Sequence, residues 1–177
     1  MKTAFVIFND LTILDFIGPY DALTRLRTMS IMPEFTWEIC AITEKVHDEK
    51  GLVVEPTKIG QSLASYDLLV IPGGMGTRKL FKEKSFIDWI GSAEPVPLKT
   101  SVCTGSLLLG AAGFLAGKRA TTHPGAFDYL EGLCKEIATD RIVDEGDVVT
   151  SGGVTAGIDL GLHLIERFAG IDARAKV

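Results

Sequence analysis

The stretch LKTSVCTGSLLLGAA, residues 98–112, decides the fold. It begins as a strand, turns at Cys103, and continues as an apolar helix through Ala112. A nucleophile elbow consists of these three parts, and it needs small residues two places before and after the nucleophile so that the turn can close. Ser101 and Gly105 meet that demand. The stretch therefore predicts a strand, an elbow with Cys103 at its tip, and a helix.

Strand-like and helical patterns alternate along the rest of the chain. Strands are predicted at 3–8, 36–42, 52–54, 67–71, 118–122 and 148–150, and helices at 18–27, 86–93, 124–133 and 155–168. The first helix is predicted to start at Gly18-Pro19, because proline suits a first helical turn. Such alternation is typical of a parallel sheet covered on both faces. We expect one doubly wound α/β domain over residues 1–177, with ligands outside the carboxyl ends of its strands.

Composition and charge exclude several classes of protein. Apolar residues make up 46% and charged residues 23%, which is typical of a soluble protein with a sizeable core. The net charge is -5 and no block of Lys or Arg occurs, which argues against a nucleic-acid partner. The longest apolar stretch, 107–117, is shorter than the ~20 residues of a membrane span, and no signal-peptide cleavage site is evident. We expect a cytoplasmic protein.

Three cysteines and three histidines occur singly along the chain. Their spacing fits neither a disulfide framework nor a metal site. The glycines also fail to complete a phosphate-binding or dinucleotide-binding pattern. We therefore expect no metal and no cofactor.

Three loops that follow predicted strands, at 72–74, 103–105 and 151–153, should meet at one edge of the sheet. Cys103 would lie there at a helix N-terminus, whose dipole and free N–H groups lower the pKa of a thiol and favour a nucleophilic thiolate. The alternative is that Cys103 is a small buried hydrophobic residue. Cys40 and Cys134 have no comparable setting, and we assign both to packing.

Backbone N–H groups near the nucleophile would stabilise developing negative charge. Gly74 and Thr104 are the candidates for this role, with Gly73 and Gly105 beside them. The alternative for Gly73 and Gly74 is that the pair merely ends a strand.

Asp15 and His123 are candidates for proton transfer and substrate contact. Asp15 lies in an apolar run after the first strand, where a carboxylate needs a partner or a raised pKa. Its alternative is a helix cap ahead of Gly18-Pro19. His123 follows a strand, so its ring could reach the same edge as Cys103. Its alternative is a purely structural histidine.

Five strings carry a resemblance to a known family: LDFIGP (14–19), IPGG (71–74), SVCTGS (101–106), GKRATTH (117–123) and GGVTAGID (152–159). The chain resembles the ThiJ/PfpI superfamily of class-I glutamine amidotransferase-like domains over nearly its whole length. Within the superfamily, the strings around Cys103 and His123 are especially similar to the isocyanide hydratases.

The resemblance implies a flavodoxin-like three-layer sandwich, a homodimer, and a small-molecule substrate without a cofactor. It implies that Cys103 is the nucleophile, that Asp15 is the general acid and base, and that Thr104 lies in the site. The reaction implied is the addition of water to an isonitrile, which yields an N-substituted formamide. Peptidases of the superfamily have His after the nucleophile, so Thr104 disfavours that activity. The hydratases also extend beyond the position of Val177.

Two other functions remain open at this point. Sensor domains of AraC-type transcription regulators carry similar strings, so the chain could bind a small molecule without catalysis. Such regulators add a helix-turn-helix domain, for which this chain has neither the length nor the basic charge. A glyoxalase, deglycase or amidase-like stress protein would keep the Cys103 chemistry and act on a carbonyl compound, with His123 in the site.

Overall fold

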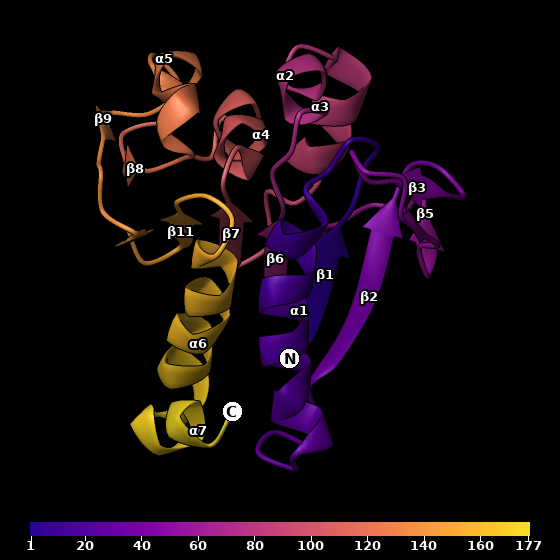
Figure 1. The fold of residues 1–177 in the computed structure, drawn as a ribbon, viewed down its shortest axis with the longest axis vertical. Coiled ribbons are helices and arrows are strands. Elements are labelled where there is room, and N and C mark those ends of the chain that lie inside the picture. Colours follow the sequence, from indigo (N-terminus) through magenta and orange to yellow (C-terminus); the bar gives the residue numbers. More distant parts are fainter.

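The computed structural model describes all of residues 1–177, and it has a mainly parallel sheet at its centre (Figure 1). The strands of this sheet are β1 (Lys2–Val6), β2 (Thr36–Ala41), β5 (Lys58–Ile59), β6 (Leu68–Ile71), β7 (Leu98–Val102), β10 (Ile142–Asp144) and β11 (Val148–Ser151). Their order is β10-β11-β7-β6-β1-β2-β5, and every pair is parallel except β10 and β11. The predicted mainly parallel sheet is confirmed.

Helices cover both faces of the sheet. They are α1 (Ile13–Thr28), α2 (Thr77–Leu80), α3 (Lys84–Gly91), α4 (Gly105–Ala111), α5 (Phe127–Leu130), α6 (Ala156–Ala169) and α7 (Ile171–Lys176), with a 3-10 turn at Pro124–Ala126. The crossovers from β1 to β2 and from β6 to β7 run in opposite directions along the sheet, so right-handed connections place α1 on one face and α2 and α3 on the other. Helix α6 packs beside α1, and α4 packs beside α2 and α3. The predicted three-layer sandwich is therefore confirmed.

This topology creates a crevice where the site is expected. Strands β1 and β6 are neighbours, yet their following helices lie on opposite faces of the sheet. The loops at their carboxyl ends separate there, which leaves room for a ligand. Strands β6 and β7 are buried along their whole length because helices cover both sides. The loops that carry the site thus follow fully buried strands.

Three predicted elements need correction. Helix α1 begins at Ile13 rather than Gly18, and Pro19 lies inside it. Residues 118–122 contribute only a two-residue strand, β8 (Arg119–Ala120), which pairs with β9 (Glu136–Ile137) outside the main sheet. The helix predicted at 124–133 is reduced to the 3-10 turn and α5.

The remaining differences concern short elements. The strand expected at 52–54 is present as β4 (Val53–Val54), which pairs antiparallel with β3 (Val46–His47). The prediction omitted β5, β9, β10, α2 and α7, each of which has six residues or fewer. Elements this short contain too few residues to show a periodic pattern. No helix combines the length and the apolar character that crossing a bilayer requires.

Candidate active site

Cys103 lies at the tip of a tight elbow between β7 and α4. Its φ angle is 55°, a left-handed conformation that is strained for a residue with a side chain. Its N–H donates to the carbonyl oxygens of Ser151 (3.0 Å) and Gly152 (3.1 Å), which fixes the elbow to the end of β11. Backbone bonds to a neighbouring strand therefore hold the strained turn, and the predicted elbow is confirmed.

Gly105 lets the elbow close against the end of β6. A Cβ atom at Gly105 would overlap the carbonyl oxygen of Ile71 and would come within 2.7 Å of that of Pro72. Both are backbone atoms, so they cannot move aside without displacing the loop that follows β6. The absence of a side chain at Gly105 thus brings two strand-end loops together.

Gly105→Ala is expected to lower the free energy of unfolding by roughly 2–4 kcal/mol, because a methyl group overlaps backbone in a packed site. Gly91→Ala is the matched control, since a Cβ at this residue of α3 meets nothing within 4 Å. Alanine there is expected to stabilise the helix by up to about 1 kcal/mol. Urea unfolding of both variants measures the two changes in the free energy of unfolding, which should have opposite signs. Equal changes would contradict the steric explanation.

Asp15 is fully buried in the first turn of α1, beside the elbow. Its Oδ2 atom accepts a hydrogen bond of 3.1 Å from the N–H of Gly73. A Cβ atom at Gly73 would come within 2.8 Å of both Asp15 Oδ2 and Cys103 Cβ, so the carboxyl and the thiol lie together beside this glycine. The alternative that Asp15 caps a helix is wrong, because its side chain binds a distant loop and the helix begins before it.

Burial raises the pKa of Asp15 to about 7, against an ordinary value of 3.8. Burial also raises the pKa of Cys103 to about 12, and the Asp15 carboxylate adds to this shift. The expectation that the helix N-terminus lowers the pKa of Cys103 is therefore wrong. The N–H of Thr104 does favour the thiolate, but the loss of water around the sulfur outweighs it.

The two groups consequently work as a pair that shares protons. Near neutral pH the Cys103 thiol keeps its proton, while the Asp15 carboxyl is close to half ionised. An ionised Asp15 is then a base beside the thiol. A protonated Asp15 is an acid at the same place.

Thr104 joins the elbow to the glycine loop after β6. Its hydroxyl Oγ1 accepts a 3.0 Å bond from the N–H of Gly74 and donates a 3.2 Å bond to the Gly74 carbonyl. The Gly74 N–H, expected to face a developing negative charge, is thus engaged by this hydroxyl. The N–H of Thr104 points instead to the Cys103 sulfur. Of the two predicted donors, Thr104 is thus the one whose N–H favours the thiolate.

His123 borders the same cavity as Cys103, as predicted, although the strand it follows, β8, lies outside the main sheet. Its Nδ1 atom accepts a 3.0 Å bond from the N–H of Gly125, so in the neutral ring the proton is on Nε2. The ring packs directly on Gly153, where a Cβ atom would collide with it. His123 therefore has a structural role in the turn and also faces the site.

The cavity beside the thiol has a volume of about 160 Å³. Besides Gly74, Cys103, Thr104 and His123, it is lined by Thr12, Glu49, Met75, Arg78 and Val154. No sequence pattern singled out these five residues, although Met75 and Arg78 follow the glycine loop closely. No three His, Cys, Asp or Glu side chains lie near enough to one another to hold a metal ion.

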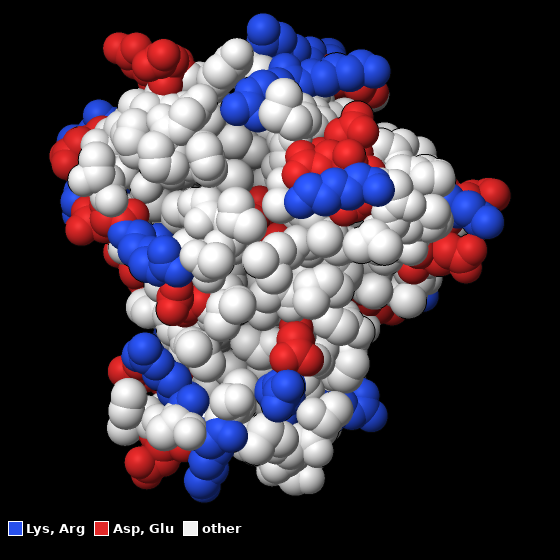
Figure 2. Space-filling view, viewed as in Figure 1, with Lys and Arg blue, Asp and Glu red and all other residues white.

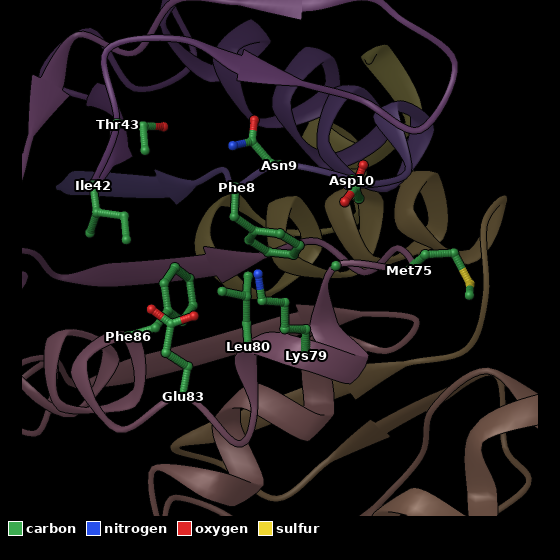
Figure 3. A pocket seen from close by; sticks show the side chains of 11 residues that line it. Phe8, Asn9, Asp10, Ile42, Thr43, Met75, Lys79, Leu80, Glu83 and Phe86 are labelled. Carbon is green, nitrogen blue, oxygen red and sulfur yellow. The ribbon is translucent and has the colours of Figure 1, made fainter.

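A larger cavity of about 280 Å³ lies next to the first and shares Met75 with it. Figure 3 shows Asn9, Asp10 and Thr43 on one side of it and Lys79, Leu80, Glu83 and Phe86 on the other. Cys103 does not line this space, whereas it lines the smaller cavity. The smaller cavity is therefore the candidate active site.

Comparison with known proteins places this geometry in a family. The model of the DJ-1/PfpI family matches residues 1–167. This chain belongs to the DJ-1/PfpI family. The predicted ThiJ/PfpI membership is thereby confirmed.

Named DJ-1/PfpI relatives include an enzyme and a regulator. Isonitrile hydratase from Pseudomonas putida is 38% identical over 179 residues, which cover 100% of this chain and 76% of that protein. The HTH-type transcriptional regulator GbdR of Pseudomonas aeruginosa is 23% identical over 98% of this chain and 48% of its own length. A solved ThiJ/PfpI family protein from Pseudomonas syringae superposes with a TM-score of 0.87 at 27% identity, covering 99% of this chain and 72% of that one.

Proposed function

We propose that this DJ-1/PfpI protein hydrates isonitriles to N-substituted formamides, with Cys103 as nucleophile and Asp15 as proton carrier. The observation that carries the proposal is the buried pair of a thiol and a carboxyl whose pKa is raised to about 7. Similarity over the whole chain to an isonitrile hydratase supports it.

The first step adds the thiol across the isonitrile carbon. Ionised Asp15 takes the proton from Cys103 Sγ, and the sulfur forms a bond to the terminal carbon of the isonitrile. Protonated Asp15 then delivers that proton to the same carbon, which produces a thioimidate. A carboxyl with a pKa near the working pH suits this double role, because both of its protonation states are accessible.

The second step adds water and releases the thiol. Asp15 takes a proton from a water molecule as the water oxygen attacks the thioimidate carbon, and it passes that proton to the nitrogen. The C–S bond then breaks as the new hydroxyl group loses its proton, Asp15 carries this second proton to the sulfur, and the product is the formamide. Overall one isonitrile and one water give one formamide, with Cys103 and Asp15 restored. In this proposal the Thr104 N–H stabilises charge on sulfur, and His123 and Gly74, which line the cavity, contact the substrate. Gly73 and Gly105 give the loops beside the cavity the space to approach each other.

The test is turnover of cyclohexyl isocyanide by the purified protein, with methylglyoxal assayed in parallel. Formamide production supports the proposal. Consumption of methylglyoxal without formamide would assign the site to carbonyl chemistry, as in a glyoxalase or deglycase.

Activity on neither compound would favour a ligand sensor, the second candidate, for which the regulator relative speaks. In that case calorimetric titration with small metabolites replaces the activity assay. We also propose a homodimer without a nucleic-acid partner, which analytical ultracentrifugation with and without DNA tests.

A further inference from the structure

Arg78 is the one guanidinium at the Cys103 cavity, and no carboxylate neutralises it. It is half-buried and lines the cavity with Cys103 and His123. Its Nη1 lies 3.1 Å from Met75 Sδ, and its Cζ lies 5.6 Å from the centre of the Tyr129 ring. The other arginines, apart from the exposed Arg27, all form ion pairs with carboxylates. Arg78 is thus held by a sulfur and a ring, with its charge left uncompensated.

The one carboxylate on the cavity wall does not neutralise Arg78. Glu49 lines the cavity, but its Oε1 accepts a 3.4 Å bond from the Thr12 hydroxyl and lies 3.9 Å from Lys50 Nζ. No ion pair joins Glu49 to Arg78. The charge on Glu49 already has partners, whereas the charge on Arg78 does not.

The surface around Arg78 is basic in an otherwise acidic protein. Lys79, Lys82 and Lys84 follow it within six residues, although the chain has a net charge of -5. Figure 2 shows Lys and Arg atoms gathered at the top of the view, over α2 and α3. Only Lys84 of these lysines has a carboxylate partner, Asp88. Such a surface attracts anions and raises their rate of encounter with the site.

We propose that Arg78 binds an anionic group of the substrate, so that the natural substrate is a small molecule with a carboxylate. A guanidinium is suited to this because its planar donors match both oxygens of a carboxylate. This inference rests on the proposed function: for an isonitrile hydratase, the substrate class is an isonitrile that also carries a carboxylate. The Tyr129 ring and Met75 hold the guanidinium in place without neutralising its charge.

The first experiment does not depend on isonitrile turnover. Iodoacetate and iodoacetamide both alkylate a thiol, with loss of iodide and formation of an S–C bond, but only iodoacetate is an anion. The tryptic peptide Thr100–Lys118 contains Cys103 as its only cysteine, so mass spectrometry reports its rate separately. The measured quantity is the ratio of the iodoacetate rate to the iodoacetamide rate, divided by the same ratio for free glutathione.

Arg78→Gln is expected to lower this normalised ratio by roughly threefold to tenfold, because a partly buried charge near the thiol is removed. Arg78→Lys keeps the charge and should retain most of the ratio. Lys82→Gln removes a neighbouring charge outside the cavity and should change the ratio by less than about twofold. Glu49→Gln should raise it. An unchanged ratio in Arg78→Gln, or an equal fall in Lys82→Gln, would overturn the proposal.

The second experiment compares isocyanoacetate with its neutral methyl ester as substrates. Wild-type protein should prefer the acid, and Arg78→Gln should raise KM for the acid by roughly fivefold more than it changes KM for the ester. If neither the ester nor the acid is turned over, the proposed hydratase activity is rejected. The alkylation ratio would still show whether Arg78 binds an anion. An ester preferred by the wild-type protein would overturn the substrate class.

Discussion

Cys103→Ala is expected to reduce formamide production by at least about 10⁴-fold, to the level of the buffer. The reason is that the substrate bonds to the sulfur, and no other thiol borders the cavity. Cys40 is buried against the Tyr66 hydroxyl, at 3.3 Å, and Cys134 lies against the carbonyl of Leu130. Gas chromatography of the formamide measures the loss.

Two further variants make this result specific. Cys103→Ser keeps a hydroxyl at the elbow, yet a carboxylate with a pKa of about 7 is far too weak a base for an alcohol, so it should also be inactive. Cys134→Ala is the matched control and should keep wild-type turnover. If Cys103→Ala keeps activity within tenfold of wild type, Cys103 is not the nucleophile.

Asp15→Asn is expected to slow turnover by roughly 10²–10⁴-fold and, at the same time, to stabilise the fold. The activity falls because an amide can neither take the thiol proton nor return it to carbon. The amide oxygen can still accept the hydrogen bond from Gly73. The elbow should therefore stay intact, so the loss reports proton transfer.

The gain in stability follows from the pKa of Asp15, raised by burial to about 7 from 3.8. The folded chain holds this proton more tightly than the unfolded chain, so the stabilisation is present in full below about pH 4. It is lost as the pH rises through 7, where a charge forms in a buried site. Asparagine never ionises. The advantage of Asp15→Asn in free energy of unfolding should therefore grow by on the order of 3 kcal/mol between pH 4 and pH 8.

Urea unfolding of the two proteins at pH 4.5, 6 and 8 measures this difference. A difference that stays constant over this range would show that Asp15 titrates normally, and it would remove the base from the mechanism. The same ionisation should appear in catalysis. In wild-type protein kcat/KM is expected to rise with pH through about 7, as Asp15 becomes a base.

Local sequence signals predicted the parts of the fold that depend on neighbouring residues. The elbow at Cys103 is such a case, because small residues two places away on each side are enough to indicate it. Helix α1 is the opposite case. Pro19 suggested a helix start, yet it lies inside α1, where it provides no N–H for the carbonyl of Asp15. The packing of α1 along α6 outweighs that local loss.

The sequence predicted several residues of the candidate site, but it did not predict the direction of the Cys103 pKa shift. Residues 15, 73 and 103 come together as expected, since each follows a strand of one parallel sheet. His123 borders the same cavity although it follows β8, which lies outside that sheet. The direction of the Cys103 pKa shift was wrong because burial is set by the whole fold, whereas a helix N-terminus can be recognised locally. Arg78 reaches the cavity from the short helix α2, and Glu49 reaches it from the turn between β3 and β4. No local sequence pattern reveals the positions of these two segments.

The crowding around the glycines has a consequence for laboratory evolution of this protein. Beneath the thiol, Cβ atoms at Gly73 and Gly74 would come within 2.8 Å of backbone atoms of Thr104 and of Thr12 and Leu11. Libraries that randomise these positions should return almost only the parent sequence. Met75, which is 58% exposed, lines the same cavity at its surface. New substrate preferences should therefore arise at the rim, while the floor of the cavity stays invariant.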